Sequence, residues 1–186
     1  MKLTIKSRAG SSKCEPKQIR RDRAIPAIVY SQGKEGNKIS VGQKEFEAAL
    51  RQLKKGHLPV TVFELVDEEG VSRKAIVKDI QYHPTTYAVL HLDFLQLFEE
   101  VPVNVRVPIE LTGGADCVGV KLGGVVRQVI RYLKVRCLPN VIPAQFQIAI
   151  EDLNIKQSRR LAAIVMPEGV RPLADLNEVA VVIAKR

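Results

Sequence analysis

The sequence is organised around one stretch near its start, Arg8-Ala-Gly-Ser-Ser-Lys-Cys-Glu-Pro-Lys-Gln-Ile-Arg-Arg-Asp-Arg-Ala-Ile-Pro-Ala-Ile-Val-Tyr30. Its first part lacks apolar periodicity, and a proline after an acidic residue predicts a short helix from about Pro16 to Arg23. The apolar run from Pro26 to Tyr30 predicts a central strand with the proline at its start. A cationic segment therefore leads directly into a strand that would anchor it to a folded body.

The positive charge of the sequence is concentrated in this region. Residues 1–56 carry 14 Lys and Arg against five Asp and Glu, whereas residues 57–186 carry 15 of each. The first third therefore holds the whole net charge of +9, and we expect the second half to form a domain without net charge. A confined excess of this kind is typical of a surface that binds a polyanion, the alternative being a solvated basic surface.

The rest of the first half predicts antiparallel strands and a second helix. Strands are predicted at Lys2–Lys6, Lys38–Val41, Val60–Val66, Val71–Ile80 and Ala88–Leu97. The turn Asp67-Glu-Glu-Gly70 predicts a hairpin, and residues 43–53 carry the apolar stripe of an amphipathic helix. These elements favour a small barrel or a strongly curled sheet.

A second domain is expected beyond Glu99-Glu100, which divides the chain into residues 1–97 and 98–186. Strands are predicted at Val101–Leu111, Val125–Leu138, Phe146–Ile150 and Glu178–Ile183. The prolines of the first of these are expected to restrict it to a sheet edge or to strand ends. The second domain is therefore mostly β.

Several classes of protein are disfavoured. No apolar run approaches the roughly 18–20 residues that span a bilayer, so we expect a soluble, cytoplasmic protein without a membrane partner. The cysteines Cys14, Cys117 and Cys137 lack CxxC spacing and predict neither a disulfide framework nor a zinc site. The three histidines are scattered, and the glycine pairs match no phosphate-binding loop. We therefore expect no metal, no cofactor and no catalytic residues.

The polar residues His91 and Asp93 have three possible interpretations. His91 and Asp93 are two residues apart in a predicted strand, so they share a face. The pair could act in acid–base catalysis, although no nucleophile motif accompanies it, or it could be a satisfied surface pair. The third interpretation, hydrogen bonding to a nucleic acid, is favoured by the basic region nearby.

RNA is a better candidate than DNA. Duplex DNA is usually bound by a helix in the major groove, and no long basic recognition helix is predicted. A-form RNA presents a wide, shallow minor groove that suits the surface of a β-body with loops. Lys and Arg would contact phosphates, while Gln, His, Asp and Tyr would contact base edges or 2′-hydroxyls.

The sequence also resembles the bacterial 5S-rRNA-binding ribosomal proteins of the general stress protein CTC family. The resemblance covers essentially the whole chain. It rests on Lys13, Lys17-Gln-Ile-Arg20-Arg21, Ile25-Pro26-Ala27-Ile-Val-Tyr30, Val77-Lys78-Asp79-Ile-Gln81-Tyr-His83-Pro84, His91-Leu-Asp93-Phe94, Gly119-Val-Lys-Leu-Gly123-Gly124-Val, Cys137-Leu-Pro139-Asn-Val-Ile-Pro143 and Met166-Pro167-Glu-Gly169-Val.

The resemblance implies a mainly β protein with an N-terminal six-stranded antiparallel barrel, short helices and a C-terminal β-rich domain. It implies a non-enzymatic component of the large ribosomal subunit that binds the loop E region of 5S rRNA through the minor groove. The implied RNA-binding residues are Arg8, Lys13, Lys17, Gln18, Arg20, Tyr30, Lys78, Gln81, His91 and Asp93. Neighbouring ribosomal proteins or 23S rRNA are the candidate partners of the second domain. The alternatives are a stress-related RNA-binding or interaction protein acting off the ribosome and, more weakly, a hydrolase using His91 and Asp93.

Overall fold

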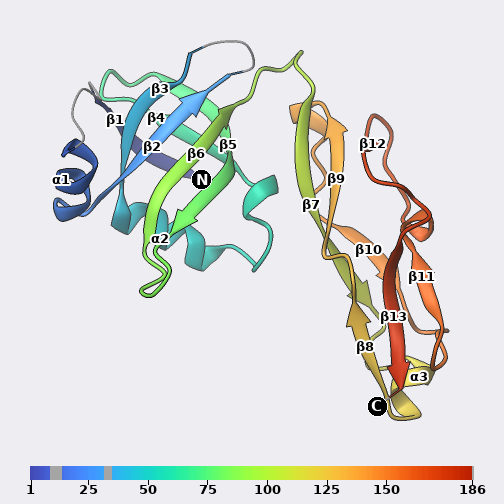
Figure 1. The fold of residues 1–186 in the computed structure, drawn as a ribbon. Coiled ribbons are helices and arrows are strands. Elements are labelled where there is room, and N and C mark those ends of the chain that lie inside the picture. Colours follow the sequence, from blue (N-terminus) through green and yellow to red (C-terminus); the bar gives the residue numbers. More distant parts are fainter. Residues whose placement is uncertain (9–13, 32–34, 186) are drawn as a thin grey trace. The chain divides into compact units, whose positions relative to one another are not determined.

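Six strands in the first half of the chain close into a barrel in the computed structural model, which describes residues 1–8, 14–31 and 35–185 (Figure 1). The strands are β1 (Lys2–Ser7), β2 (Ala24–Tyr30), β3 (Asn37–Gly42), β4 (Val62–Val66), β5 (Ser72–Tyr82) and β6 (Val89–Gln96). Their order around the barrel is β1-β3-β2-β6-β5-β4. The predicted six-stranded barrel is confirmed, and its pairings are antiparallel except for β1–β4 and β2–β6, which are parallel.

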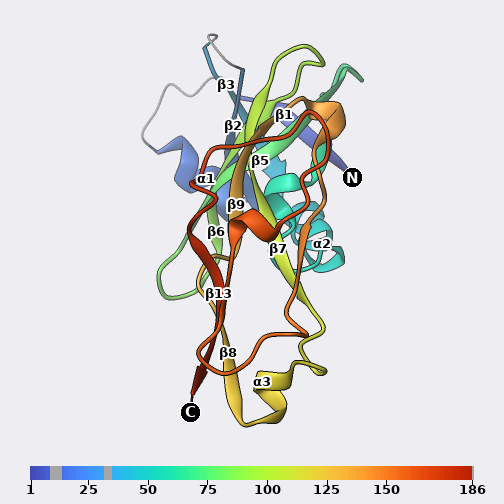
Figure 2. The same cartoon turned by 90° about the vertical axis from the view of Figure 1, so that its right-hand side faces the viewer.

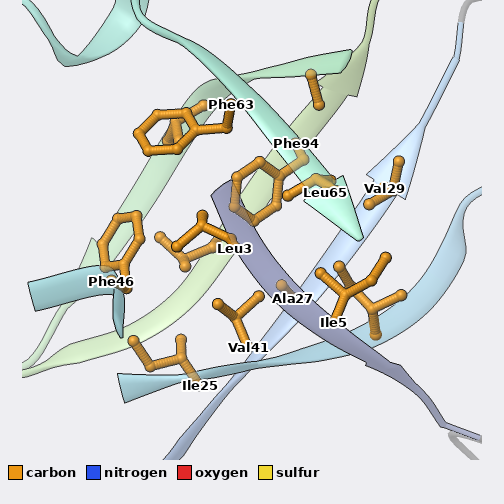
Figure 3. Close-up of a cluster of buried hydrophobic side chains, with 14 of the residues drawn as sticks. Leu3, Ile5, Ile25, Ala27, Val29, Val41, Phe46, Phe63, Leu65 and Phe94 are labelled. Carbon is orange, nitrogen blue, oxygen red and sulfur yellow. The ribbon is translucent and has the colours of Figure 1, made fainter. Parts of the chain in front are cut away.

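The interior of the barrel is filled by alternate apolar residues of each strand (Figure 3). Phe63 and Phe94 meet edge-on with ring centroids 6.3 Å apart, and Phe46 lies 6.4 Å from Phe63. All three rings are fully buried, so each contributes roughly 1.5–3 kcal/mol by apolar burial. This core fixes which residues of β2, β5 and β6 face outward.

Two helices and a short 3₁₀ segment, η1 (Leu58–Val60), accompany the barrel. Helix α2 (Gln43–Gln52) buries Phe46 and Ala49 of its predicted apolar stripe in the barrel core. Helix α1 (Glu15–Arg21) buries no residue and keeps its basic surface exposed. It ends before the predicted Arg23, because Arg23 has a φ of 57°, outside the helical region.

Strand β2 begins two residues before the predicted start. Pro26 is therefore its third residue, and it lies opposite Ser40 of β3. Pairing with β6 begins only at Ala27, so the missing proline N–H falls where that ladder has not yet started. The predicted central position of the strand, between β3 and β6, is confirmed.

The chain divides into two compact units, Met1–Val101 and Pro102–Arg186. The second contains the strands β7 (Val103–Thr112), β8 (Gly124–Gln128), β9 (Tyr132–Cys137), β10 (Phe146–Ala149), β11 (Ser158–Arg160), β12 (Arg171–Pro172) and β13 (Val179–Lys185). Its helical segments are α3 (Val118–Lys121), η2 (Pro139–Val141) and η3 (Leu161–Ala163). One sheet has the order β10-β7-β9-β12 and the other β11-β13-β8, which confirms a β-rich second half. Figure 2 shows β7, β8, β9 and β13 of this unit from a second direction.

Two expectations for the second half are wrong. The predicted strand from Val125 to Leu138 is interrupted, because β8 and β9 belong to different sheets. Strand β7 is not confined to an edge: it lies between β9 and β10 although it contains Pro108. Residues 103–108 pair with β9 and residues 109–112 pair with β10, so Pro108 stands where the pairing changes sides. The ladder therefore accommodates a residue without an N–H.

The expectation that the second half has no net charge is also wrong. The earlier count began at residue 57, whereas the second unit begins at Pro102. Residues 102–186 carry 12 Lys and Arg against seven Asp and Glu, a net charge of +5. The acidic residues that balanced the earlier count lie between positions 57 and 101, in the barrel unit. Positive charge is thus a property of both units.

Candidate RNA-binding surface

Five of the predicted RNA-binding residues lie on the outward side of three neighbouring strands, β2, β6 and β5. They are Tyr30, Lys78, Gln81, His91 and Asp93. Gln81 lies directly opposite His91, and Asp93 lies between Asp79 of β5 and Ile28 of β2. We call the outward surface formed by these five residues and Asp79 the β2–β6–β5 face.

A β-bulge shapes this face. The register between β5 and β6 shifts between Val77 and Asp79, which makes Lys78 the extra residue. Val77 points into the core, and both Lys78 and Asp79 are exposed. The bulge therefore places a cation and a carboxylate next to each other on the outer surface.

His91 and Asp93 form a hydrogen-bonded pair, with 2.7 Å between Nδ1 and Oδ1. An ionised carboxylate only accepts hydrogen bonds, so Nδ1 of His91 carries the proton and donates it. In the neutral imidazole, Nε2 is then an acceptor. The pair is partly exposed, with side-chain exposures of 17% for His91 and 34% for Asp93, so a ligand can reach it.

Tyr30 lies near the two carboxylates of the face. Partial burial raises the pKa of its phenol, and the negative charges of Asp93 and Asp79 raise that pKa further. The hydroxyl therefore stays protonated well above neutral pH and can both donate and accept a hydrogen bond.

Helix α1 adds cations beside the face. The helix carries three of the predicted RNA-binding residues, Lys17, Gln18 and Arg20, and all three are exposed. Arg20 donates from Nε to the backbone oxygen of Leu90, 3.1 Å away, at the start of the strand that carries His91. This hydrogen bond connects the basic helix to β6 and leaves the terminal guanidinium nitrogens as the outer part of the side chain.

Arg8 belongs to a different part of the barrel. It follows β1 and donates from Nε to the backbone oxygen of Ile39, 3.0 Å away. It lines a cavity of about 370 Å³ at one mouth of the barrel, together with Arg73, Lys38 and Asp67. β3 separates its strand from β2, so the structure does not bring Arg8 onto the β2–β6–β5 face. Lys13 lies outside the described residues.

Both units of the chain match known ribosomal protein families. Residues 3–94 match the model of the ribosomal L25p family, and residues 102–186 match that of the ribosomal protein TL5 C-terminal domain. Similar proteins named large ribosomal subunit protein bL25 occur in Chlamydia muridarum (strain MoPn / Nigg), Chlamydia trachomatis serovar L2 and Chlamydia pneumoniae. Their identities to the chain are 44%, 45% and 42% over 186 residues, covering both sequences in full. The chain belongs to the bL25 family.

Membership of this family confirms the prediction of a non-enzymatic protein of the large ribosomal subunit. The bL25 proteins are structural components of the large ribosomal subunit in the bacterial cytoplasm, and they are not enzymes. Within the described residues, no three His, Cys, Asp or Glu side chains are grouped so that they could hold a metal ion. None of the helices in the described part of the chain is long and apolar enough to cross a membrane.

Asp79 is the one member of the face that the sequence did not single out. Two signals could have found it: it is two residues from Gln81 on the same strand, and it lies within the Val77–Gln81 motif. The bulge at Lys78 breaks the simple alternation of β5, which makes the orientation of Asp79 hard to derive from spacing alone.

Proposed function

We propose that this bL25-family protein binds 5S rRNA, in its loop E region, through the β2–β6–β5 face and the adjoining helix α1. The proposal is carried by one observation: five residues from three separate sequence motifs converge on the outward side of adjacent strands. The proposed contacts of the face and the helix are Lys17, Gln18, Arg20, Tyr30, Lys78, Gln81, His91 and Asp93, with Asp79 in addition. Arg8, from a different part of the barrel, and Lys13 are proposed as further contacts. We assign this role to the barrel domain, residues 1–97.

The chemistry of the face suits the minor groove of A-form RNA. That groove is shallow and displays 2′-hydroxyls and base edges to a surface that cannot enter deeply. The cations of α1 and Lys78 can contact phosphates at the rim. The hydroxyl of Tyr30, the amide of Gln81 and Nε2 of His91 can exchange hydrogen bonds with 2′-hydroxyls.

The two carboxylates are informative because they would repel a polyanion. Asp79 and Asp93 lie directly opposite each other on β5 and β6, an arrangement of like charges that costs stability. A carboxylate on an RNA-binding surface is useful where it accepts from a donor, such as the guanine amino group in the minor groove or a 2′-hydroxyl. We infer that Asp79 and Asp93 accept hydrogen bonds from donor groups on the RNA.

Neutralising Asp93 separates recognition from general charge attraction. Asp93→Asn removes a negative charge, so a purely electrostatic surface would bind 5S rRNA more tightly. We expect weaker binding, because the acceptor and the support of His91 are both lost. Glu64→Gln is the matched control: Glu64 lies on β4, the strand farthest around the barrel from β2, and the charge change is the same.

The two variants are compared by titration of labelled 5S rRNA with full-length protein. Tighter binding by Asp93→Asn, equal to or beyond that of Glu64→Gln, would contradict the proposed recognition. A truncated chain of residues 1–101 tests the domain assignment in the same assay, and failure of that folded fragment to bind would show that the second unit is needed.

A further inference from the structure

The second unit carries a cluster of cations on one side of its larger sheet. Arg106 of β7 lies directly opposite Lys134 of β9, and Arg136 of β9 lies directly opposite Arg171 of β12. Directly opposite residues, and residues two apart on one strand, point to the same side of a sheet. All four side chains are exposed. We call this set the C-terminal cationic face.

The opposite side of the same strands is apolar and buried. Val105 and Val107 alternate with Arg106, and Leu133, Val135 and Cys137 alternate with the cations of β9. The register of the face is therefore fixed by the core, because a shift of one residue would bury the charges. The four charges lie on a rigid grid, with spacings of about 4.5–5.5 Å across strands and roughly 6.6 Å along them.

This arrangement has a cost within the folded chain. Like charges directly opposite each other on neighbouring strands are destabilising, and the face contains two such pairs. The ion pairs of this unit, among the described residues, use other cations: Lys121 with Asp116 at 3.3 Å and Arg159 with Asp152 at 3.5 Å. Glu110, the carboxylate of β7, lies beyond Pro108 where the strand pairs with β10. An external anion would relieve the repulsion.

We propose that the C-terminal cationic face binds the phosphate backbone of a double-helical RNA segment distinct from the one held by the barrel. The core of a protein-binding surface is depleted in charged residues. Here four cations occupy adjacent positions, and the exposed apolar side chain of Leu173 lies at their margin, directly after the edge strand β12. Surfaces for single-stranded RNA interleave aromatic platforms with cations, and here Tyr132 stands alone at the end of β9. The inference does not depend on 5S rRNA being the barrel's ligand.

The test uses the full-length protein saturated with 5S rRNA, to which a fluorescent RNA duplex of arbitrary sequence is added. The test variant is Lys134→Gln with Arg136→Gln. The control is Lys185→Gln with Arg127→Gln, which removes the same two charges from exposed positions on the other sheet, on β13 and β8. Thermal denaturation of both variants checks that the second unit stays folded.

We expect wild-type protein and the control to form a ternary complex, and the test variant to bind the duplex at least tenfold more weakly. The salt dependence of log K should also fall by about 1.8, since each lost phosphate contact lowers the slope by roughly 0.9. Equal losses in both variants, or no duplex binding by the wild type, would overturn the proposal. Polyglutamate of matched charge is added as a competitor, and displacement of the duplex at equal charge concentration would show that the face takes acidic proteins instead.

The same experiment distinguishes this inference from the proposed function. If 5S rRNA does not bind at all, the role proposed for the barrel is wrong. The comparison of the two variants with the duplex still reports on the C-terminal cationic face alone, because neither variant alters the barrel.

Discussion

Replacing Arg20 with alanine tests whether helix α1 contacts RNA phosphates. The Nε of Arg20 donates to the backbone oxygen of Leu90 at 3.1 Å in an exposed position. A hydrogen bond of this kind contributes about 0.5–1.5 kcal/mol, and exposure places it at the low end of that range. The barrel core is untouched, so Arg20→Ala should fold and lose mainly its interaction with RNA.

The loss of affinity can be estimated from one phosphate contact. Each contact contributes roughly 0.7–0.9 to the slope of log K against log salt. At 0.1 M salt this corresponds to a factor of about five to eight in affinity, if the non-electrostatic part is unchanged. Arg20→Lys should retain most of the slope, because it keeps the charge, while losing the hydrogen bond to Leu90.

Titration of labelled 5S rRNA between about 50 and 200 mM salt measures both quantities. Arg51→Ala is the matched control, since Arg51 is also an exposed arginine in the last turn of a barrel helix. The control should leave the slope unchanged. A slope for Arg20→Ala equal to that of the wild type would refute the phosphate contact.

Three further predictions concern stability and ionisation. Lys134→Glu should raise the free energy of unfolding by about 0.2–1 kcal/mol at low salt, because the new carboxylate would lie opposite Arg106. Thermal denaturation should show a higher melting temperature at low salt and no gain near 1 M salt. The raised pKa of Tyr30 means that the folded chain keeps this proton when the unfolded chain releases it near pH 10.0, so stability falls as the pH rises through the folded-state pKa. Asp93→Asn should lower that pKa in an ultraviolet titration, and an unchanged value would exclude its charge as a cause. Gly124→Ala should destabilise the second unit alone by roughly 1–3 kcal/mol, because its Cβ would lie 2.6 Å from the backbone oxygen of Gly119. Calorimetry should show one transition shifted, with 5S rRNA binding retained.

The barrel was predictable because its signals are local. The alternation of β4 and β5 around a turn, the stripe of α2 and the apolar run of β2 each follow from a few neighbouring residues. The pairing of His91 with Asp93 was predictable for the same reason, since residues two apart share a face of a strand.

Other features depend on register between distant strands, which spacing alone does not determine. The bulge that orients Asp79 arises from the pairing of β5 with β6. Pro108 fits inside a sheet because its strand changes partners there. The cations of the second unit form a face only once β7, β9 and β12 are aligned, and a charge count that crossed the boundary between the units concealed them.

The central claim, that the β2–β6–β5 face lies against 5S rRNA, is tested most directly by photocrosslinking in the assembled large subunit. The photoreactive residue p-benzoylphenylalanine replaces Tyr30 on the face in one variant and Glu64 on β4 in another. Irradiation should crosslink the variant at position 30 to 5S rRNA and should not crosslink the variant at position 64 to it. Crosslinking of 5S rRNA from position 64 but not from position 30 would contradict the account.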